Sequence, residues 1–406
     1  ISYDEIFDNS YNTFSFASGY EGENESLVDK NSWNKYNEYS PPGIASVSLY
    51  HHLASLIEKN FGEQNIFFRY NLIRILSVIM GALFVYLSYL IARNIGFSQK
   101  ISLLLTAIVA FQPRFSIYSA TINYDNLLIL AFIIFTLGGV LMLKNNPNWK
   151  NILLIVFSVL LGFFSKGTGI VLLVGGALLL AYFMYLKIKD KSLNIKLLMS
   201  FMFICLTICA TIFLAIFLKK YFSTDASETG LFDSLGKYLS KNFTLGKFRL
   251  SSRAYWGTLT WTDTWFITYA IYIIWIIQTA AAAGIVFFIS SKKKIEYLPE
   301  KKYVIFFLGM LLLLQVAIRL VDWLFFYTTG KIVTGVPGRY FIPNLTAHII
   351  LVFVGIGTLI EKIALHYKKS DLAEKYFERS LIVGLILMMT FMMYIIFNVI
   401  IYRYYL

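Results

Sequence analysis

Apolar segments alternate with short polar segments along most of the chain after residue 70. Each apolar segment holds roughly 15 to 25 residues, close to the length that crosses a bilayer as an α-helix. Because these segments recur with few charges inside them, the pattern predicts an all-α polytopic membrane protein. We predict ten spans, at residues 72–94, 101–119, 125–143, 151–165, 169–187, 197–218, 265–289, 303–321, 341–360 and 381–401.

Two polar segments interrupt this pattern. Residues 1–70 carry ten acidic and four basic residues, and residues 219–264 carry seven basic and four acidic residues. Neither segment is apolar enough to span a membrane. We therefore predict four parts, with residues 1–70 as a first extracytoplasmic domain and 219–264 as a long extracytoplasmic loop. Residues 71–218 and 265–406 form the N-terminal and C-terminal transmembrane bundles.

The composition supports a membrane protein. Of the 406 residues, 58% are hydrophobic and 15% are charged, whereas soluble domains contain about 25% charged residues. This excludes a soluble enzyme, a disulfide-rich scaffold, a disordered chain and a water-exposed nucleic-acid binder. Cys205 and Cys209 lie four residues apart in an apolar segment, and we interpret them as small core residues.

The net charge of +13 follows from membrane topology, because Lys and Arg accumulate in cytoplasmic loops. One alternate set of loops carries 18 basic and seven acidic residues. The basic residues are Arg93, Lys100, Lys144, Lys150, Lys187, Lys189, Lys191, Lys196, Lys292, Lys293, Lys294, Lys301, Lys302, Lys362, Lys368, Lys369, Lys375 and Arg379. We predict that this side is cytoplasmic, in the cell (inner or plasma) membrane, and that no nucleic acid is a partner.

The N-terminal segment raises a question of membrane insertion. An extracytoplasmic segment that begins with Ile1 needs a preceding element to carry it across the membrane. We expect a signal-anchor helix before it, which would bring the protein to about eleven spans.

Charged residues are missing from the middle of every predicted span. Arg74, Arg319 and Asp322 all fall near predicted outer ends. Proton and ion relays place ionisable groups deep in the membrane, and many transporters show inverted repeats, which this sequence lacks. Both observations argue against a transporter.

Asp4 and Glu5 form a carboxylate pair at the start of the predicted first external domain. Such a group, held near the membrane surface and partly buried, could act as a general base on a hydroxyl group. An ordinary solvated acidic loop remains the alternative for this pair.

Lys166 and Arg339 each precede a predicted outer helix start, in the sequences Lys-Gly-Thr-Gly and Pro-Gly-Arg. Free backbone N–H groups, the helix dipole and a nearby cation together form an anion site, and a guanidinium can bind phosphate with two hydrogen bonds. We predict that both residues, with Arg114, contact the phosphate of a lipid-linked donor. The alternative is that these cations reach lipid headgroups.

Other polar and aromatic residues gather on the same predicted face. We assign Asn123, Asp125, Trp256 and Trp261 to substrate binding. Asp125 could instead cap the helix that it opens, and the tryptophans could belong to an interfacial aromatic belt. We assign no metal and no firm cofactor, because no cluster of ligands supports a divalent cation.

Taken together, these motifs resemble the GT-C superfamily of integral-membrane glycosyltransferases. The closest resemblance is to a bacterial membrane family known as a conserved domain of unknown function. The matching residues, in chain order, are Asp4-Glu5, Pro41-Pro42, Pro113 to Asp125 with Ser119 and Asn123, Lys166 to Gly169, Tyr255 to Trp261, and Gly338 to Pro343. They cover about 340 residues, and the ordered set is more specific than any one motif.

The resemblance implies transfer of a sugar outside the cytoplasm from a polyprenyl-phosphate-linked donor to a glycan or protein acceptor, as in cell-envelope polysaccharide synthesis. It implies Asp4 as the base, Glu5 as its neighbour, and Lys166 and Arg339 as phosphate contacts. Ser40 stands where the family has the His of a His-Pro-Pro sequence, so the role of this position stays open. A flippase or other transporter of lipid-linked saccharides is the second hypothesis, and a membrane scaffold is the third.

Overall fold

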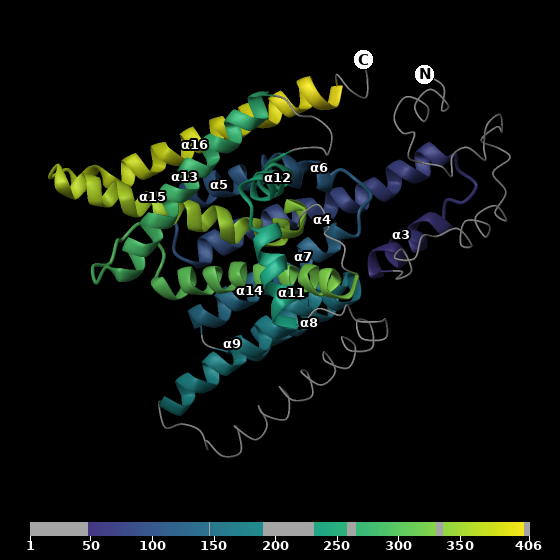
Figure 1. The fold of residues 1–406 in the computed structure, drawn as a ribbon, viewed down its shortest axis with the longest axis horizontal. Helices are drawn as coiled ribbons and strands as arrows, with labels where there is room; N and C mark the ends of the chain where they lie inside the picture. Colours follow the sequence, from purple (N-terminus) through teal and green to yellow (C-terminus); the bar gives the residue numbers. More distant parts are fainter. Residues whose placement is uncertain (1–47, 146, 190–230, 258–264, 330–335, 402–406) are drawn as a thin grey trace.

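The computed structural model describes residues 48–145, 147–189, 231–257, 265–329 and 336–401. All regular elements in these ranges are helices (Figure 1). The N-terminal half contains α3 (Leu49–Lys59), α4 (Ile66–Asn94), α5 (Gln99–Ala110), α6 (Pro113–Ser119), α7 (Asp125–Asn145), α8 (Trp149–Ser165), η3 (Gly167–Gly169) and α9 (Ile170–Lys189). The remainder contains α11 (Leu231–Asn242), α12 (Leu245–Trp256), α13 (Trp265–Ser290), α14 (Lys301–Thr329), η4 (Gly338–Asn344), α15 (Leu345–His366), η5 (Ser370–Leu372), α16 (Ala373–Ile395) and η6 (Ile396–Ile401).

The all-α membrane fold predicted from the sequence is confirmed. Within the described ranges, seven helical segments are long and apolar enough to cross a membrane, or eight if a bent pair counts as one span. They correspond to seven of the ten predicted segments, and the bent pair corresponds to the predicted span 101–119. The predicted span 151–165 is the shorter apolar helix α8. The predicted span 197–218 lies outside the described residues.

The segment predicted as one continuous span at 101–119 is bent. The helices α5 and α6 meet at an angle of 71°. Pro113 occupies the first turn of α6, where its missing N–H costs nothing, and the Gln112 side chain accepts a hydrogen bond of 2.6 Å from the N–H of Phe115. The average hydropathy of residues 101–119 does not reveal this break, because the helices on both sides of it are apolar overall.

Helix α7 is the centre of the bundle. In its most apolar stretch 83% of the residues are buried, against 17% for the corresponding stretch of α16. A helix that is apolar on all sides must be buried by other helices or by lipid. Here α7 is enclosed by protein, with α8 and α4 among its neighbours, whereas α16 leaves most of its apolar surface for the bilayer.

Short elements gather at one end of the bundle. The helix α3 packs against α4 and α8, and η4 packs against both α12 and α7. The predicted loop 219–264 contains two of these elements, α11 and α12. The helix α11 is anchored to α14, because the buried Tyr238 donates a hydrogen bond of 2.6 Å to Oδ2 of Asp322. This end of the molecule holds most of the candidate site residues.

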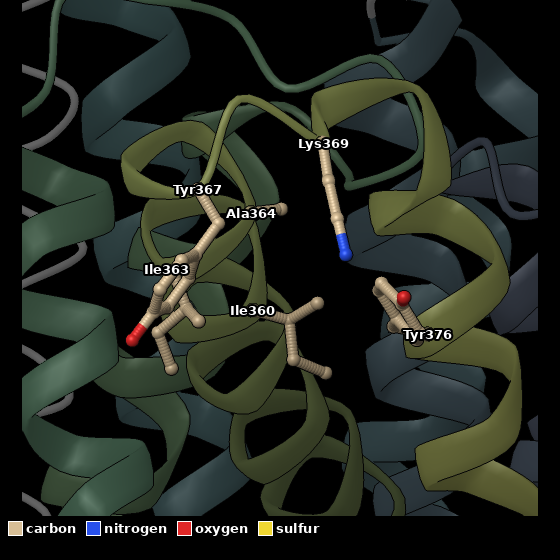
Figure 2. Close-up of a pocket in the computed structure, with 6 residues that line it drawn as sticks. All are labelled: Ile360, Ile363, Ala364, Tyr367, Lys369 and Tyr376. Carbon is tan, nitrogen blue, oxygen red and sulfur yellow. The ribbon is translucent and has the colours of Figure 1, made fainter.

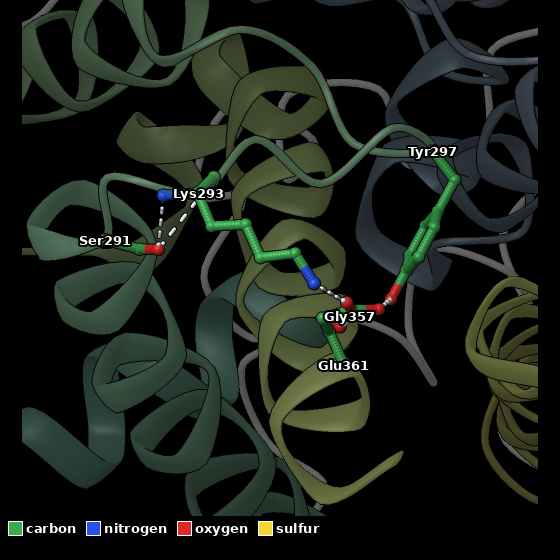
Figure 3. A network of polar contacts seen from close by, with 5 residues as sticks. All are labelled: Ser291, Lys293, Tyr297, Gly357 and Glu361. Atoms are coloured by element: carbon green, nitrogen blue, oxygen red, sulfur yellow. Dashed lines mark hydrogen bonds and ion pairs between the residues drawn. The ribbon is translucent and has the colours of Figure 1, made fainter. Parts of the chain in front are cut away.

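The opposite end is fastened by a different polar network (Figure 3). Glu361, near the end of α15, accepts contacts of 3.4 Å from both Nζ of Lys293 and the hydroxyl of Tyr297. The same hydroxyl contacts the carbonyl oxygen of Gly357 at 3.1 Å. Burial and the nearby Glu361 raise the pKa of Tyr297, so its hydroxyl keeps the proton that it donates. The network holds the connection between α13 and α14 against α15.

Candidate functional site

The loop before α7 is held by its own asparagines. The side chain of Asn123 accepts a hydrogen bond of 2.9 Å from the backbone N–H of Asp125, which opens α7. The side chain of Asn126 donates to the carbonyl oxygens of Tyr118 and Thr121, at 2.9 and 3.1 Å. Such bonds from short polar side chains fix turns at helix starts. The predicted substrate residue Asn123 thus fixes the backbone at Asp125.

Lys166 stands between α8 and η3. Its backbone is extended, with φ −161° and ψ 148°, and its carbonyl accepts a bond of 2.7 Å from the N–H of Gly169. The turn lies so close to the end of α8 that a Cβ on Gly169 would collide with the carbonyl of Gly162. Gly162 and Gly169 therefore allow the chain to turn sharply here. This turn places Lys166 near the start of α7.

The ammonium of Lys166 is paired with the carboxylate of Asp125. The Nζ to Oδ1 distance is 2.7 Å, and the two side chains are 19% and 13% exposed. Asp125 also lies in the first turn of α7, where a helix dipole favours a negative charge. Asp125, which the sequence suggested as a substrate residue or a helix cap, therefore also forms an ion pair with Lys166. The sequence alone did not connect these two residues.

Two tyrosine rings complete the surroundings of Lys166. Its Nζ lies 4.8 Å from the ring centroid of Tyr124 and 4.7 Å from that of Tyr340. Both distances are within the range of cation–π attraction. Burial alone lowers the pKa of Lys166, but Asp125 and the two tyrosines outweigh it, and the net pKa is raised. Lys166 is therefore positively charged throughout the physiological range.

Arg339 approaches the same aromatic ring. Its guanidinium carbon lies 5.4 Å from the centroid of Tyr340, and its side chain also reaches the hydroxyl of Tyr118. Unlike Lys166, Arg339 is exposed. The structure thus brings two predicted phosphate contacts, 173 positions apart in the sequence, to the same ring of Tyr340.

The short helix η4 that carries Arg339 is seated on α12. Gly338 lies so close to this helix that a Cβ on it would collide with the backbone of Ser251 and Tyr255. The N–H of Tyr340 then bonds to the carbonyl of Pro337 at 3.1 Å and closes the turn. A residue larger than glycine at position 338 would displace Arg339.

Arg114, the third predicted phosphate contact, is on α6 and is only 5% exposed. Its Nη2 donates to the hydroxyl of Tyr118 at 2.9 Å, and its guanidinium lies 4.6 Å from the centroid of the same ring. Since Tyr118 also faces Arg339, this tyrosine connects the two arginines. We call Arg114, Tyr118, Lys166, Arg339 and Tyr340 the cation cluster.

Trp256, predicted as a substrate residue, is 4% exposed at the end of α12. Its ring centroid lies 5.8 Å from that of His348 on α15. The neighbouring Tyr255 shares a hydrogen bond of 2.8 Å with Nδ1 of His348, and the other ring nitrogen of this histidine lies 2.9 Å from Nε2 of Gln278. Burial raises the pKa of Tyr255. In this structure Trp256 is buried against Tyr255 and His348, at the end of the helix on which η4 is seated.

Several predicted residues lie outside the described part of the chain. These are the carboxylate pair Asp4 and Glu5, Ser40 in the Pro-Pro segment, and Trp261. Their roles stay predictions.

Four aromatic residues around the site received no role from the sequence: Tyr118, Tyr124, Tyr340 and His51. Tyr124 and Tyr340 directly neighbour Asp125 and Arg339, so adjacency to charged candidates was the available signal. His51 on α3 lies 5.8 Å from the ring of Tyr124, and burial together with His52 lowers its pKa. Among the described residues, no group of three or more His, Cys, Asp or Glu side chains could hold a metal ion.

One of the comparisons with known proteins gives a match, to part of the chain. The family model of dolichyl-phosphate-mannose-protein mannosyltransferase matches residues 45–222, which include the start of α7 and the Lys166 turn. No curated protein and no solved structure matches the chain. The chain is thus an all-α membrane protein, and its residues 45–222 are similar to a mannosyltransferase family of the GT-C superfamily, the superfamily that its motifs resemble.

Proposed function

We propose that the chain transfers a sugar from a polyprenyl-phosphate-linked donor to a hydroxyl group of a glycan or protein acceptor on the extracytoplasmic side of the membrane. The observation that carries this proposal is the cation cluster. Three cationic side chains meet around two tyrosines at one end of a membrane bundle, in a chain with a glycosyltransferase family domain. A flippase, the alternative function, receives no support from the family match.

The chemistry needs positive charge where the leaving group develops negative charge. As the acceptor oxygen bonds to the anomeric carbon, the bond from that carbon to the phosphate oxygen breaks and its electron pair stays on the phosphate. Cations and hydrogen-bonding groups that are already in position around this phosphate stabilise the transition state most effectively. Arg339 is exposed and has a planar fork that matches a phosphate. We assign it the first contact with the donor.

Lys166 would contribute in a different way. Its ammonium is already neutralised by Asp125 at 2.7 Å, so a donor phosphate either shares this cation with the carboxylate or displaces it. Asp125 therefore lowers the net positive charge of the cation cluster, so that the cluster does not bind every anion equally. The tyrosines Tyr118 and Tyr340 supply hydroxyl groups beside the cations.

The proton of the acceptor hydroxyl needs a base. The family resemblance assigns this role to Asp4, with Glu5 as its neighbour. In Asp4→Asn, side-chain volume is kept while proton acceptance is lost, so turnover should fall by roughly 100- to 10,000-fold with donor binding retained. Glu5→Gln is the matched control and should lose less, although adjacent carboxylates can exchange roles. Full turnover of Asp4→Asn in an assay limited by chemistry would exclude Asp4 as the base.

The decisive experiment measures transfer by the purified full chain from labelled polyprenyl-phosphate sugars to an acceptor. Arg339→Ala removes a charge-assisted contact of about 1.5–3 kcal/mol, so donor efficiency should fall by about ten- to a hundredfold. Arg339→Lys should restore only part of it. Arg69→Ala is the matched control, because it also removes one arginine. Arg69 is paired with Glu58 and is not part of the cation cluster. Equal donor dependence in wild type, Arg339→Ala and Arg69→Ala would contradict the proposal, as would lipid translocation in liposomes without any transfer.

The side of the membrane is tested separately. Ser240 on α11 and Ser370 in η5 are both exposed and lie near opposite ends of the bundle. Single cysteines at these positions should separate the two faces, since only the one at position 240 should react with an impermeant maleimide in intact cells. Reaction at position 370 alone would reverse the topology.

A further inference from the structure

The turn that joins α15 to α16 lies between two membrane-spanning segments and therefore at a membrane surface. A pocket of about 300 Å³ opens beside it (Figure 2). Its lining residues are Ile360, Ile363, Ala364, Tyr367, Lys369 and Tyr376. At 1.5 Å per residue, the 22-residue α15 separates this pocket from the cation cluster by roughly 33 Å. The pocket is thus distinct from the candidate site.

The geometry of the turn places an ammonium group in this pocket. The N–H of Lys369 bonds to the carbonyl of Ala364 at 2.7 Å, and the N–H of Lys368 bonds to that of Leu365 at 3.1 Å. These two bonds form a Schellman motif, which normally brings an apolar side chain back over the last turn of the helix. Here the returning residue is Lys369, and its side chain extends into the gap between Ile360 and Tyr376 (Figure 2).

The backbone at Lys368 is the second unusual feature. Its φ is +56°, the left-handed conformation that glycine or asparagine normally adopts in this motif. A non-glycine residue is less stable there, by about 1 kcal/mol. The chain therefore holds consecutive lysines in a turn that glycine would form more easily, and such strain often marks a functional site.

The charge balance around the turn favours an anion. Four carboxylates lie near the turn. Glu361 is paired with Lys293 and Glu378 with Lys100. The exposed Asp371 and Glu374 are outnumbered by the lysines of the same segment, Lys362, Lys368, Lys369 and Lys375. In the part of the chain that the structure describes, no carboxylate forms an ion pair with Lys369. Its ammonium is thus available to a ligand.

The walls of the pocket favour an amphiphile. Ile363 is 58% exposed at the end of a membrane span, so the apolar wall continues into the lipid-facing surface. A volume of about 300 Å³ suits the phosphate and glycerol of a lipid, with the acyl chains outside along α15. Basic pockets between transmembrane helices commonly bind anionic headgroups in this way.

From these observations we infer that the pocket between α15 and α16 binds an anionic phospholipid, with its phosphate on Lys369 and the start of its acyl chains against Ile360 and Ile363. This binding would fasten the turn to one leaflet. It requires no sugar transfer and is independent of the proposed function.

The experiment uses the full chain in detergent, titrated with phosphatidylglycerol or phosphatidylcholine of the same acyl chains, with bound lipid counted by native mass spectrometry. Wild type should prefer phosphatidylglycerol. Lys369→Gln should weaken phosphatidylglycerol binding by about fivefold. Lys368→Gln is the matched control, because it removes the same charge one residue away, keeps a non-glycine residue in the turn, and does not line the pocket; it should bind like wild type.

Two further arms complete the test. Ile360→Trp fills the pocket without changing its charge and should also weaken phosphatidylglycerol binding. Inorganic phosphate should not compete with the lipid, since it lacks acyl chains. Equal losses in Lys369→Gln and Lys368→Gln would overturn the inference in favour of general surface attraction. Unchanged binding in Lys369→Gln, or full competition by inorganic phosphate, would also overturn it.

Discussion

Two ion pairs near opposite ends of the bundle differ in how they meet water. Lys166 and Asp125 are 2.7 Å apart, with side chains 19% and 13% exposed. Lys293 and Glu361 are 3.4 Å apart, and although Glu361 is only 11% exposed, Lys293 is 62% exposed. In the first pair both charges have lost most of their water, whereas in the second pair the ammonium keeps it. The first pair should therefore be costly to break, and the second should be replaceable by solvent.

The neighbours of the two pairs sharpen the contrast. Lys166 lies against the rings of Tyr124 and Tyr340, which hold the ammonium in one position. Glu361 receives a contact from the hydroxyl of Tyr297, so it keeps a partner even without Lys293. A tightly enclosed pair is expensive for folding but gives a cation a fixed place, which a binding site needs. A solvated pair fastens a loop and demands little precision.

The largest effect is expected from Lys166→Met. The substitution leaves the carboxylate of Asp125 enclosed without its cation, and such uncompensated charges destabilise by several kcal/mol. Because both side chains keep some exposure, we expect a loss of about 2–4 kcal/mol in the free energy of unfolding. Chemical unfolding in detergent measures it.

The double variant Lys166→Met with Asp125→Asn serves as its control. It removes both charges, so it should recover most of the stability while donor transfer stays low. If the single and double variants unfold alike, the pair is not the source of the loss.

The pH dependence of unfolding gives the next effect. The pKa of Lys166 is raised in the folded protein, from the ordinary 10.5. Its contribution to stability is therefore fully present below about pH 10.5 and is lost as the pH rises through the folded pKa. Unfolding measured between pH 8 and 12 should show this loss in wild type but not in Lys166→Met. A parallel decline in both proteins would assign the loss to other groups.

The smallest effect is expected at the opposite end. Lys293→Ala breaks a pair whose cation is mostly solvated, so the free energy of unfolding should change by less than about 1 kcal/mol. Glu361→Gln keeps an acceptor for Tyr297 and should also cost about 1 kcal/mol. Thermal unfolding of both variants beside Lys166→Met tests the order. A loss at Lys293→Ala as large as that of Lys166→Met would remove the distinction between the two pairs.

The sequence was most informative about individual helices. Apolar length predicts spans because the bilayer imposes it, and most of the described spans start and end within a few residues of the predicted limits. Two are longer than predicted at one end: the span predicted at 381–401 begins at Ser370, and the span predicted at 303–321 continues to Thr329. The bend at Pro113 was missed, since a hydropathy average is insensitive to one residue without an N–H. The short α8 followed by a glycine turn correctly suggested that Lys166 stands at a helix junction.

Relations between distant segments could not be read from the sequence. Asp125 and Lys166 are 41 positions apart, and their contact depends on how α7 packs against α8. Tyr340 comes from η4 in the second half of the chain, and only the close seating of Gly338 on α12 brings it to Lys166. Sequence motifs identified charged candidates, but the partner of each charge depends on tertiary packing.

The bend between α5 and α6 has a mechanical consequence. Gln112, at the bend, donates a hydrogen bond of 2.7 Å to the carbonyl of Tyr255 in α12. The same helix α12 supports η4 through Gly338. A displacement of α12 would therefore be transmitted in two directions, to α6 with Arg114 and to η4 with Arg339. The two arginines would move together, so in the proposed function an acceptor that contacts α12 would change how tightly the arginines hold a donor.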